Sequence, residues 1–230
     1  MDNRAIGVFD SGIGGLTVVK ELMKILPNEK IVYFGDTARV PYGSRSEETI
    51  KKFSKECISF LDKKDIKSLI IACNTVSAVA IEMLKEEFDM HILGVIIPGS
   101  KMASEVTNNN RIGVIGTNAT VNSGAYEKCI KSENEQNIMG CTHYPILENT
   151  INIVVGDKIK LVNPAKETAA EMKKYLEMNN LLNEDINVKD NIFYITDDEN
   201  KFKKNLLDFI EIENPIIKKI DLKEKQIDEK

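Results

Sequence analysis

The chain has 230 residues, 42% of them apolar and 29% charged, which is the composition of a folded protein with one large or two small cores. A net charge of −5 and an isoelectric point near 5.3 argue against nucleic acid as the main partner, because phosphate binding needs a basic face. No apolar run reaches membrane-spanning length, and the start Met1-Asp2-Asn3-Arg4-Ala5 lacks the basic region of a signal peptide. We therefore expect a cytoplasmic protein without a membrane partner.

Strand and helix patterns alternate along the first hundred residues, which predicts an α/β fold with a parallel sheet. The expected strands are 6–9, 30–34, 69–72 and 91–96, and the expected helices are 16–26, 47–61 and 77–84. Pro98-Gly99 is typical of a turn and marks a candidate domain boundary. Further along, helices are expected at 166–176 and 202–210, with a strand at 191–196 between them.

The pattern of the first strand restarts near residue 110, which indicates an internal duplication. Ile112-Gly113-Val114-Ile115-Gly116-Thr117 echoes Ile6-Gly7-Val8-Phe9-Asp10-Ser11, and each predicted strand ends in a hydroxyl residue before a helix. The two halves differ in length, because 62 positions separate Ser11 from Cys73 but only 24 separate Thr117 from Cys141. The difference of about 38 residues is enough for one strand and one helix.

We therefore expect a first α/β domain made of residues 1–97 plus 164–222. Residues 98–163 would form a shortened second α/β domain, and residues 223–230 a charged tail.

Two cysteines occupy similar places in the two halves. Cys73 follows a buried strand and precedes a helix start at Asn74-Thr75, and Cys141 repeats this arrangement more weakly. Backbone N–H groups and the helix dipole stabilise a thiolate, so we expect Cys73 to be acidic and reactive. Cys57 and Cys129 are expected to be small buried apolar residues instead.

No metal site is expected, because the two histidines, His91 and His143, are too few and too far apart for usual zinc spacing.

The first strand ends in the glycine-rich turn Asp10-Ser11-Gly12-Ile13-Gly14-Gly15. The dinucleotide-binding pattern would need a glycine where Thr17 stands, so the turn predicts only a general anion site at a helix start. A tight turn without any ligand fits the same residues. The presence of Asp10 favours a ligand-binding role for the turn, because a carboxylate at the carboxyl end of a strand points into the crevice where open α/β sheets bind their ligands.

Four segments of the chain, in the same order, resemble bacterial glutamate racemase over nearly the whole length up to Ile220. These segments are Gly7-Val8-Phe9-Asp10-Ser11-Gly12-Ile13-Gly14-Gly15-Leu16-Thr17-Val18, Gly35-Asp36-Thr37-Ala38-Arg39-Val40-Pro41-Tyr42-Gly43, Ala72-Cys73-Asn74-Thr75 and Gly140-Cys141-Thr142-His143-Tyr144-Pro145. The resemblance implies two similar parallel-sheet α/β domains, with glutamate bound in the cleft between them. It also implies interconversion of L- and D-glutamate without a cofactor, which supplies D-glutamate for peptidoglycan, and often a homodimer.

The resemblance further implies that Cys73 and Cys141 are the two catalytic bases, with Asp10 assisting Cys73 and His143 assisting Cys141. The residues that would bind the substrate are Asp10, Ser11, Pro41, Tyr42, Gly43, Cys73, Asn74, Thr75, Thr117, Thr120, Thr142 and His143. Helix capping is an alternative role for Asn74, Thr75 and Thr142, and turn packing is one for Tyr42.

Two thiols suit this chemistry on physical grounds. Racemisation removes the Cα proton from one face and returns a proton to the other, so a cofactor-free enzyme benefits from acid/base groups on opposite faces. A thiol titrates near 8.5, so modest tuning gives one thiol and one thiolate near neutral pH.

The chain departs from the family between Tyr126 and Gly140, where the family carries a strand, an Ala-Cys-Pro turn and a helix with an acidic residue of supporting role. Only 127–139 fill this span, so that acidic residue is not assigned. A second departure is Val162-Asn163-Pro164-Ala165, where the family usually has an Asp-Ser pair.

Loss of a strand and a helix exposes apolar neighbours, so the second domain is rearranged, swapped between subunits or poorly folded, unless the sequence omits residues. The alternative function is therefore a catalytically degenerate relative that acts as an amino-acid or protein binding module.

Overall fold

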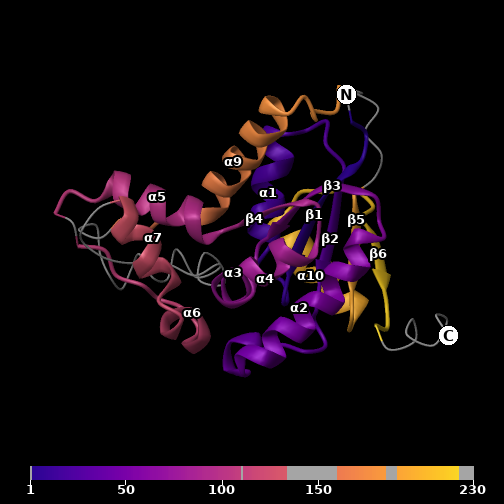
Figure 1. The fold of residues 1–230 in the computed structure, drawn as a ribbon. Coiled ribbons are helices and arrows are strands. Elements are labelled where there is room, and N and C mark those ends of the chain that lie inside the picture. Colours follow the sequence, from indigo (N-terminus) through magenta and orange to yellow (C-terminus); the bar gives the residue numbers. More distant parts are fainter. Residues whose placement is uncertain (1, 110, 134–159, 185–190, 223–230) are drawn as a thin grey trace.

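A computed structural model describes residues 2–109, 111–133, 160–184 and 191–222 (Figure 1). Six parallel strands form a sheet in the order β4-β3-β1-β2-β5-β6. The strands are β1 Ala5–Asp10, β2 Ile31–Gly35, β3 Ile66–Ile71, β4 His91–Gly94, β5 Ile192–Ile195 and β6 Ile216–Lys219. The predicted α/β fold with a parallel sheet is confirmed, and β6 is a strand that the sequence pattern did not predict.

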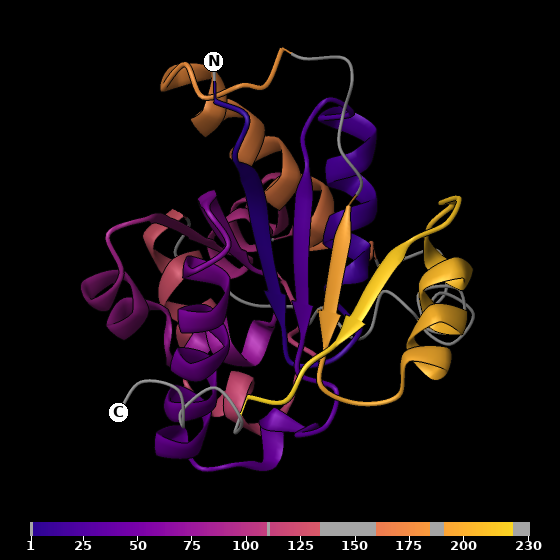
Figure 2. The ribbon, with the colours of Figure 1, turned by 90° about the vertical axis from the view of Figure 1, so that its right-hand side faces the viewer.

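Helices cover both faces of this sheet (Figure 2). The helices are α1 Leu16–Ile25, α2 Glu47–Asp62, α3 Asn74–Val79, α4 Ile81–Glu87, α5 Ile96–Val106, α6 Asn118–Asn122, α7 Ala125–Glu133, α9 Pro164–Met178 and α10 Glu199–Phe209, with a 3-10 turn η1 at Tyr42–Ser44. Buried side chains of α1, α9 and α10 form one core against the sheet, and those of α2, α3 and α4 form a second core on the opposite face.

The strand sequences follow from this two-sided burial. Every residue of β1 is buried: Ile6 and Val8 pack in the core of α1 and α9, while Ala5 and Phe9 pack in the core of α2. A strand covered on both faces needs apolar side chains at consecutive positions rather than at alternate ones. The central strands can therefore be recognised as short continuous apolar runs.

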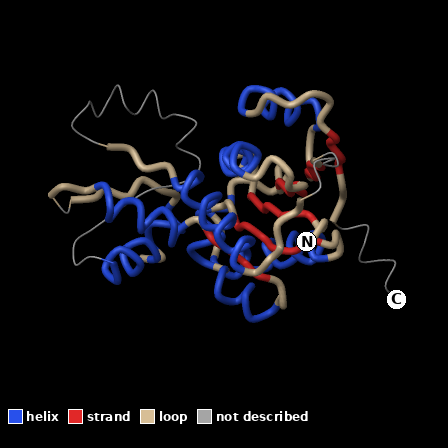
Figure 3. The backbone as a smooth tube through the Cα atoms, turned by 90° about the horizontal axis from the view of Figure 1, so that it is seen from above, coloured by secondary structure: helices blue, strands red, loops and turns tan. Residues whose placement is uncertain are grey.

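Residues 96–109 and 111–133 form a helical lobe beside the sheet (Figure 3). Pro98-Gly99 is not a turn, because α5 runs through both residues. Proline is tolerated there since the first turn of a helix has no intrahelical partner for its N–H. Gly99 allows close packing, because a Cβ at that position would lie 2.9 Å from Pro164 Cβ.

The predicted strand at 112–117 is also wrong. The structure assigns neither helix nor strand to residues 111–117, and Ile112 and Val114 are half-buried against a small core of Ile96, Tyr126 and Ile130. A strand needs a hydrogen-bonded neighbour, and no strand of the described chain pairs with this segment. Within the predicted second domain, residues 134–159 lie outside the described residues.

Across the described ranges, no helix has the length and apolar character that would be needed to cross a lipid bilayer.

Candidate functional site

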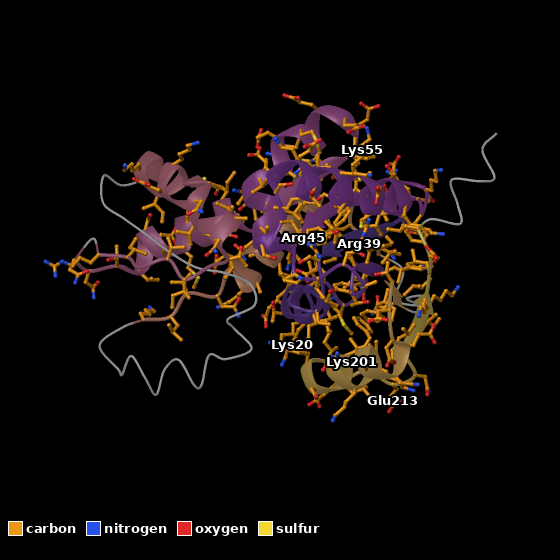
Figure 4. The ribbon with its side chains drawn as sticks, turned by 90° about the horizontal axis from the view of Figure 1, so that it is seen from below. Lys20, Arg39, Arg45, Lys55, Lys201 and Glu213 are labelled. Carbon is orange, nitrogen blue, oxygen red and sulfur yellow. The ribbon has the colours of Figure 1, made fainter. Side chains whose placement is uncertain are left out.

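A cavity of about 370 Å³ opens at the carboxyl edge of the sheet, beside the ends of β1, β2 and β5. Open parallel sheets bind ligands at this edge. The cavity is lined by Ser11, Gly12, Ile13, Thr37, Val40, Pro41, Tyr42, Gly43, Thr75, Thr117, Asp197, Asp198, Lys201, Phe202 and Asn205. Viewed from below, Lys201 of α10 lies on the same side as Lys20 of α1, whereas Arg39 and Arg45 lie toward α2 (Figure 4). Side chains from both ends of the chain therefore meet at one cavity.

Asp10 ends β1 next to this cavity and is fully buried. Its Oδ1 accepts a 2.8 Å hydrogen bond from the Gly12 backbone N–H, whereas its Oδ2 has no hydrogen-bond partner in the described part of the chain. The turn after it packs closely, because a Cβ on Gly15 would lie 2.8 Å from Asp10 Cβ and 2.9 Å from Ala72 Cβ. The glycine-rich turn thus brings the end of β1 against the end of β3.

Cys73 is the N-cap residue of α3 and is completely buried, with its Sγ 3.2 Å from Ser11 Oγ. Burial raises the pKa of Cys73 to about 12, and the nearby Asp10 carboxylate adds to the shift. Hydrogen bonds from Ser11 and from the Val76 backbone N–H act in the opposite direction and do not cancel it. The predicted acidic thiol is therefore wrong for this structure, because water exclusion and a neighbouring negative charge outweigh the start of a six-residue helix.

Asn74 follows Cys73 and is 1% exposed. Its Oδ1 accepts a hydrogen bond from the hydroxyl of Tyr126, which belongs to α7 of the helical lobe. Its Nδ2 is buried and has no acceptor among the described residues. Cys73 is thus close to an acceptor, Asp10 Oδ2, and is followed by a donor, Asn74 Nδ2. Neither of these two atoms has a hydrogen-bond partner among the described residues.

Three threonine hydroxyls join the sheet domain to the helical lobe. Thr75 Oγ1 lies 2.9 Å from Thr117 Oγ1 and 3.5 Å from Thr120 Oγ1, and the latter two oxygens are 3.0 Å apart. Thr117 also caps α6 by accepting from the Thr120 N–H. Gly43 packs directly on Thr117, because a Cβ at Gly43 would lie 2.3 Å from Thr117 Cβ. The structure thus brings these four predicted site residues together.

The Tyr42 side chain belongs to a buried polar cluster beneath the cavity wall. Its hydroxyl donates to Asp36 Oδ2, which also accepts from Arg39 Nε at 2.6 Å. Asp36 Oδ1 accepts from Thr196 Oγ1 at 2.9 Å. Burial raises the pKa of Tyr42, and the charges of Cys57 and Asp36 raise it further, so the phenol remains a donor. Tyr42 therefore lines the cavity while its hydroxyl donates to Asp36, and a role for it in substrate binding stays a prediction.

Cys57 is buried as predicted, but it lies in a polar setting, with its Sγ 3.3 Å from Arg39 Nη2. Cys129 is only half-buried, at the edge of the small core of the helical lobe, so the prediction of a buried residue is wrong there.

Cys141, Thr142 and His143 lie outside the described residues. Among the residues that are described, no three His, Cys, Asp or Glu side chains gather as metal ligands would.

Sequence reasoning missed several residues of the site region. Asp36 directly follows β2 and so lies at the same edge of the sheet as Asp10, which is a signal visible in the sequence. Tyr126 and the α10 residues Lys201, Phe202 and Asn205 carry no local signal, because only the folded chain brings them to this edge.

Comparison with known proteins places the chain among amino-acid racemases. The Asp/Glu/Hydantoin racemase family model matches residues 6–137. The glutamate racemase of Geobacter metallireducens is 41% identical over 222 aligned residues, covering 78% of this chain and 82% of the relative. The glutamate racemase of Bacillus cereus is 40% identical over 245, covering 88% and 91%.

Solved structures agree with these relatives. Glutamate racemase RacE1 of Bacillus anthracis superposes with a TM-score of 0.91 at 30% identity, covering 96% of this chain and 99% of that one. Glutamate racemase of Francisella tularensis in complex with D-glutamate gives 0.88 at 35% identity, covering 97% and 100%.

The Bacillus cereus alignment also contains a gap. It has 245 positions, but 88% of the 230 residues is only about 202, so about 43 positions of the relative have no counterpart here. The model match over more than half of the chain, together with relatives above 30% identity, shows that the chain belongs to the Asp/Glu/Hydantoin racemase family.

Proposed function

We propose that this protein is a cofactor-independent glutamate racemase that interconverts L- and D-glutamate and supplies D-glutamate for peptidoglycan. The family relatives named glutamate racemase support the substrate, as does the relative that binds D-glutamate. One observation carries the proposal for this chain. The buried Cys73 lies near Asp10 Oδ2 and directly precedes Asn74 in the chain, and Oδ2 and the Asn74 Nδ2 both lack partners in the described part of the chain. An acceptor and a donor beside a thiol suit the ammonium and carboxylate groups of an amino acid.

In the proposed mechanism, the thiolate of Cys141 takes the Cα proton from one face of glutamate. The electron pair left on Cα is delocalised into the α-carboxylate, and the Cys73 S–H gives its proton to the opposite face. The products are the other enantiomer, a Cys141 thiol and a Cys73 thiolate. The reverse reaction restores the starting protonation.

The surroundings of Cys73 favour this assignment of roles. A pKa raised to about 12 keeps Cys73 protonated at neutral pH, so it starts as the acid. After it has given up the proton, the same raised pKa makes its thiolate a strong base for the reverse direction. In this scheme Asp10 assists Cys73 and His143 assists Cys141.

The second half of the site is also a proposal. Residues 98–163 would form a shortened second domain that carries Cys141, Thr142 and His143, and about 43 missing positions support the shortening. The contact of Gly43 and Thr75 with Thr117 supports a site between two parts of the chain. We further propose a homodimer that works in the cytoplasm.

Deuterium incorporation tests the proposed function. Each glutamate enantiomer is incubated with the protein in D₂O, and loss of the Cα–H signal and optical inversion are followed by proton NMR and circular dichroism. We expect both for the natural protein, and neither inversion nor full exchange for Cys73→Ser or Cys141→Ser. Cys129→Ser, which changes a half-buried thiol outside the site, is the matched control and should retain activity.

Two outcomes would reject the racemase. Glutamate binding without exchange at Cα would identify a catalytically degenerate relative that acts as a binding module. If the protein neither bound glutamate nor exchanged its Cα proton, glutamate would be excluded as the ligand.

A further inference from the structure

A tyrosine of the helical lobe is hydrogen-bonded to the Asn74 side chain. The Tyr126 hydroxyl donates a hydrogen bond to Asn74 Oδ1 across 52 positions of sequence. Both side chains are almost fully buried, with 3% and 1% of their surfaces exposed. A hydrogen bond between two such groups, shielded from water, has few competitors.

In this contact the amide oxygen of Asn74 faces the phenol and the amide nitrogen faces away from it. A carboxamide has an acceptor oxygen and a donor NH₂ group, and these exchange places when the group turns over. Because the phenol donates to Oδ1, the Asn74 Nδ2 is left without a partner in the described chain. A buried donor without an acceptor costs about 1–3 kcal/mol, so native proteins keep one where a ligand completes it.

The packing around Tyr126 keeps its hydroxyl in place. Tyr126 forms the small core of the lobe with Ile96 and Ile130. A Cβ on Gly99 would lie 3.7 Å from the ring and hydroxyl of Tyr126, so the tyrosine lies directly against the α5 backbone. The position of the hydroxyl is therefore set by α5 and α7 rather than by the sheet domain that carries Asn74.

We infer that Tyr126 is a positioning residue that holds the Asn74 Nδ2 as a donor for a carboxylate oxygen of the bound amino acid. The opposite orientation would present Oδ1, which repels a carboxylate. The inference rests on the proposed function for the identity of the ligand. It assigns ligand orientation to a residue of the helical lobe that does not line the cavity.

Kinetics of Tyr126→Phe test the inference, with Tyr175→Phe on α9 as the matched control. We expect the KM for both glutamate enantiomers to rise about tenfold, the equivalent of one hydrogen bond, while kcat changes by less than about threefold. The same change in an Asn74→Ala background should have almost no further effect, because Tyr126 acts only through the amide. An unchanged KM in Tyr126→Phe, or an equal loss in both backgrounds, would overturn the inference.

A spectroscopic measurement is independent of activity. The side-chain NH₂ signals of Asn74 in a proton–nitrogen correlation spectrum are identified by their loss in Asn74→Ala. In Tyr126→Phe we expect these signals to shift and broaden because the amide can turn over, and unchanged signals would refute the positioning role. If the natural protein neither binds nor racemises glutamate, the proposed function fails while the NH₂ signals still decide the role of Tyr126.

Discussion

Replacing Cys73 by serine tests the raised thiol pKa through the pH dependence of protein stability. The thiol has a pKa of about 12 in the folded chain against an ordinary value of 9.0, because it is buried beside Asp10. Its stabilising effect is therefore fully present below about pH 9. Between about pH 9 and pH 12 the unfolded chain releases this proton while the folded chain keeps it, so the free energy of unfolding falls as the pH rises.

The size of the effect follows from the two pKa values. Each pH unit in this window lowers the free energy of unfolding by about 1.4 kcal/mol, and the loss is about 2 kcal/mol at about pH 10.5. Cys73→Ser has no proton to release in this range. The gap in stability between the natural protein and the variant should therefore change by about 2 kcal/mol between about pH 7 and pH 10.5.

Urea unfolding at several pH values, followed by circular dichroism, measures this gap. Titration of the buried Tyr42, whose raised pKa does not depend on Cys73, is common to both proteins and cancels in the difference. Cys129→Ser is the control, because its thiol is half-buried and far from Asp10 in sequence. Parallel stability curves for the natural protein and Cys73→Ser would refute the reasoning, since they would place the thiol pKa near its ordinary value.

Two further predictions concern packing and a buried ion pair. In Gly43→Ala the new Cβ would lie 2.3 Å from Thr117 Cβ, so we expect the KM for glutamate to rise at least about tenfold. Gly113→Ala is the control, because a Cβ at Gly113 has no atom within 4 Å and this variant should behave as the natural protein. Equal KM values in the two variants would contradict the prediction. Lys67→Met leaves Glu29, whose Oε2 lies 2.6 Å from Lys67 Nζ, buried without its partner, and should lower the free energy of unfolding by about 3–5 kcal/mol in urea titrations. A decrease in the free energy of unfolding below about 1 kcal/mol would contradict this, and would show that Glu29 is hydrated or protonated in the variant.

Much of the sheet could be predicted because its strands are buried on both faces. Continuous apolar runs mark β1 and β3 without knowledge of their neighbours, and the rule that parallel strands end at one edge brings Asp10 toward Cys73. The glycine-rich turn adds to this, since Gly15 permits the close contact between the two strand ends. These features depend on local sequence and on one general rule of topology.

The remaining features depend on contacts between distant segments. The sequence predicts a turn at Pro98-Gly99 because proline and glycine usually interrupt helices, yet a first helical turn accepts both. The pKa of Cys73 depends on water exclusion and on Asp10, neither of which a helix-start motif reveals. Tyr126 reaches Asn74 only because α7 packs against α5, and β6 has a short, half-exposed sequence without a clear pattern.

The hydroxyl contacts of Thr75, Thr117 and Thr120 have a consequence for how firmly the helical lobe is held against the sheet. Each hydroxyl both donates and accepts, and none carries a formal charge. If these hydroxyls were separated, water could replace their hydrogen bonds one for one, and no ion would be left in an apolar surrounding. These three hydroxyl contacts would therefore add little to the free energy needed to separate the helical lobe from the sheet, which leaves the buried Tyr126–Asn74 hydrogen bond and the packing of Gly99 on Pro164 to hold the lobe in place.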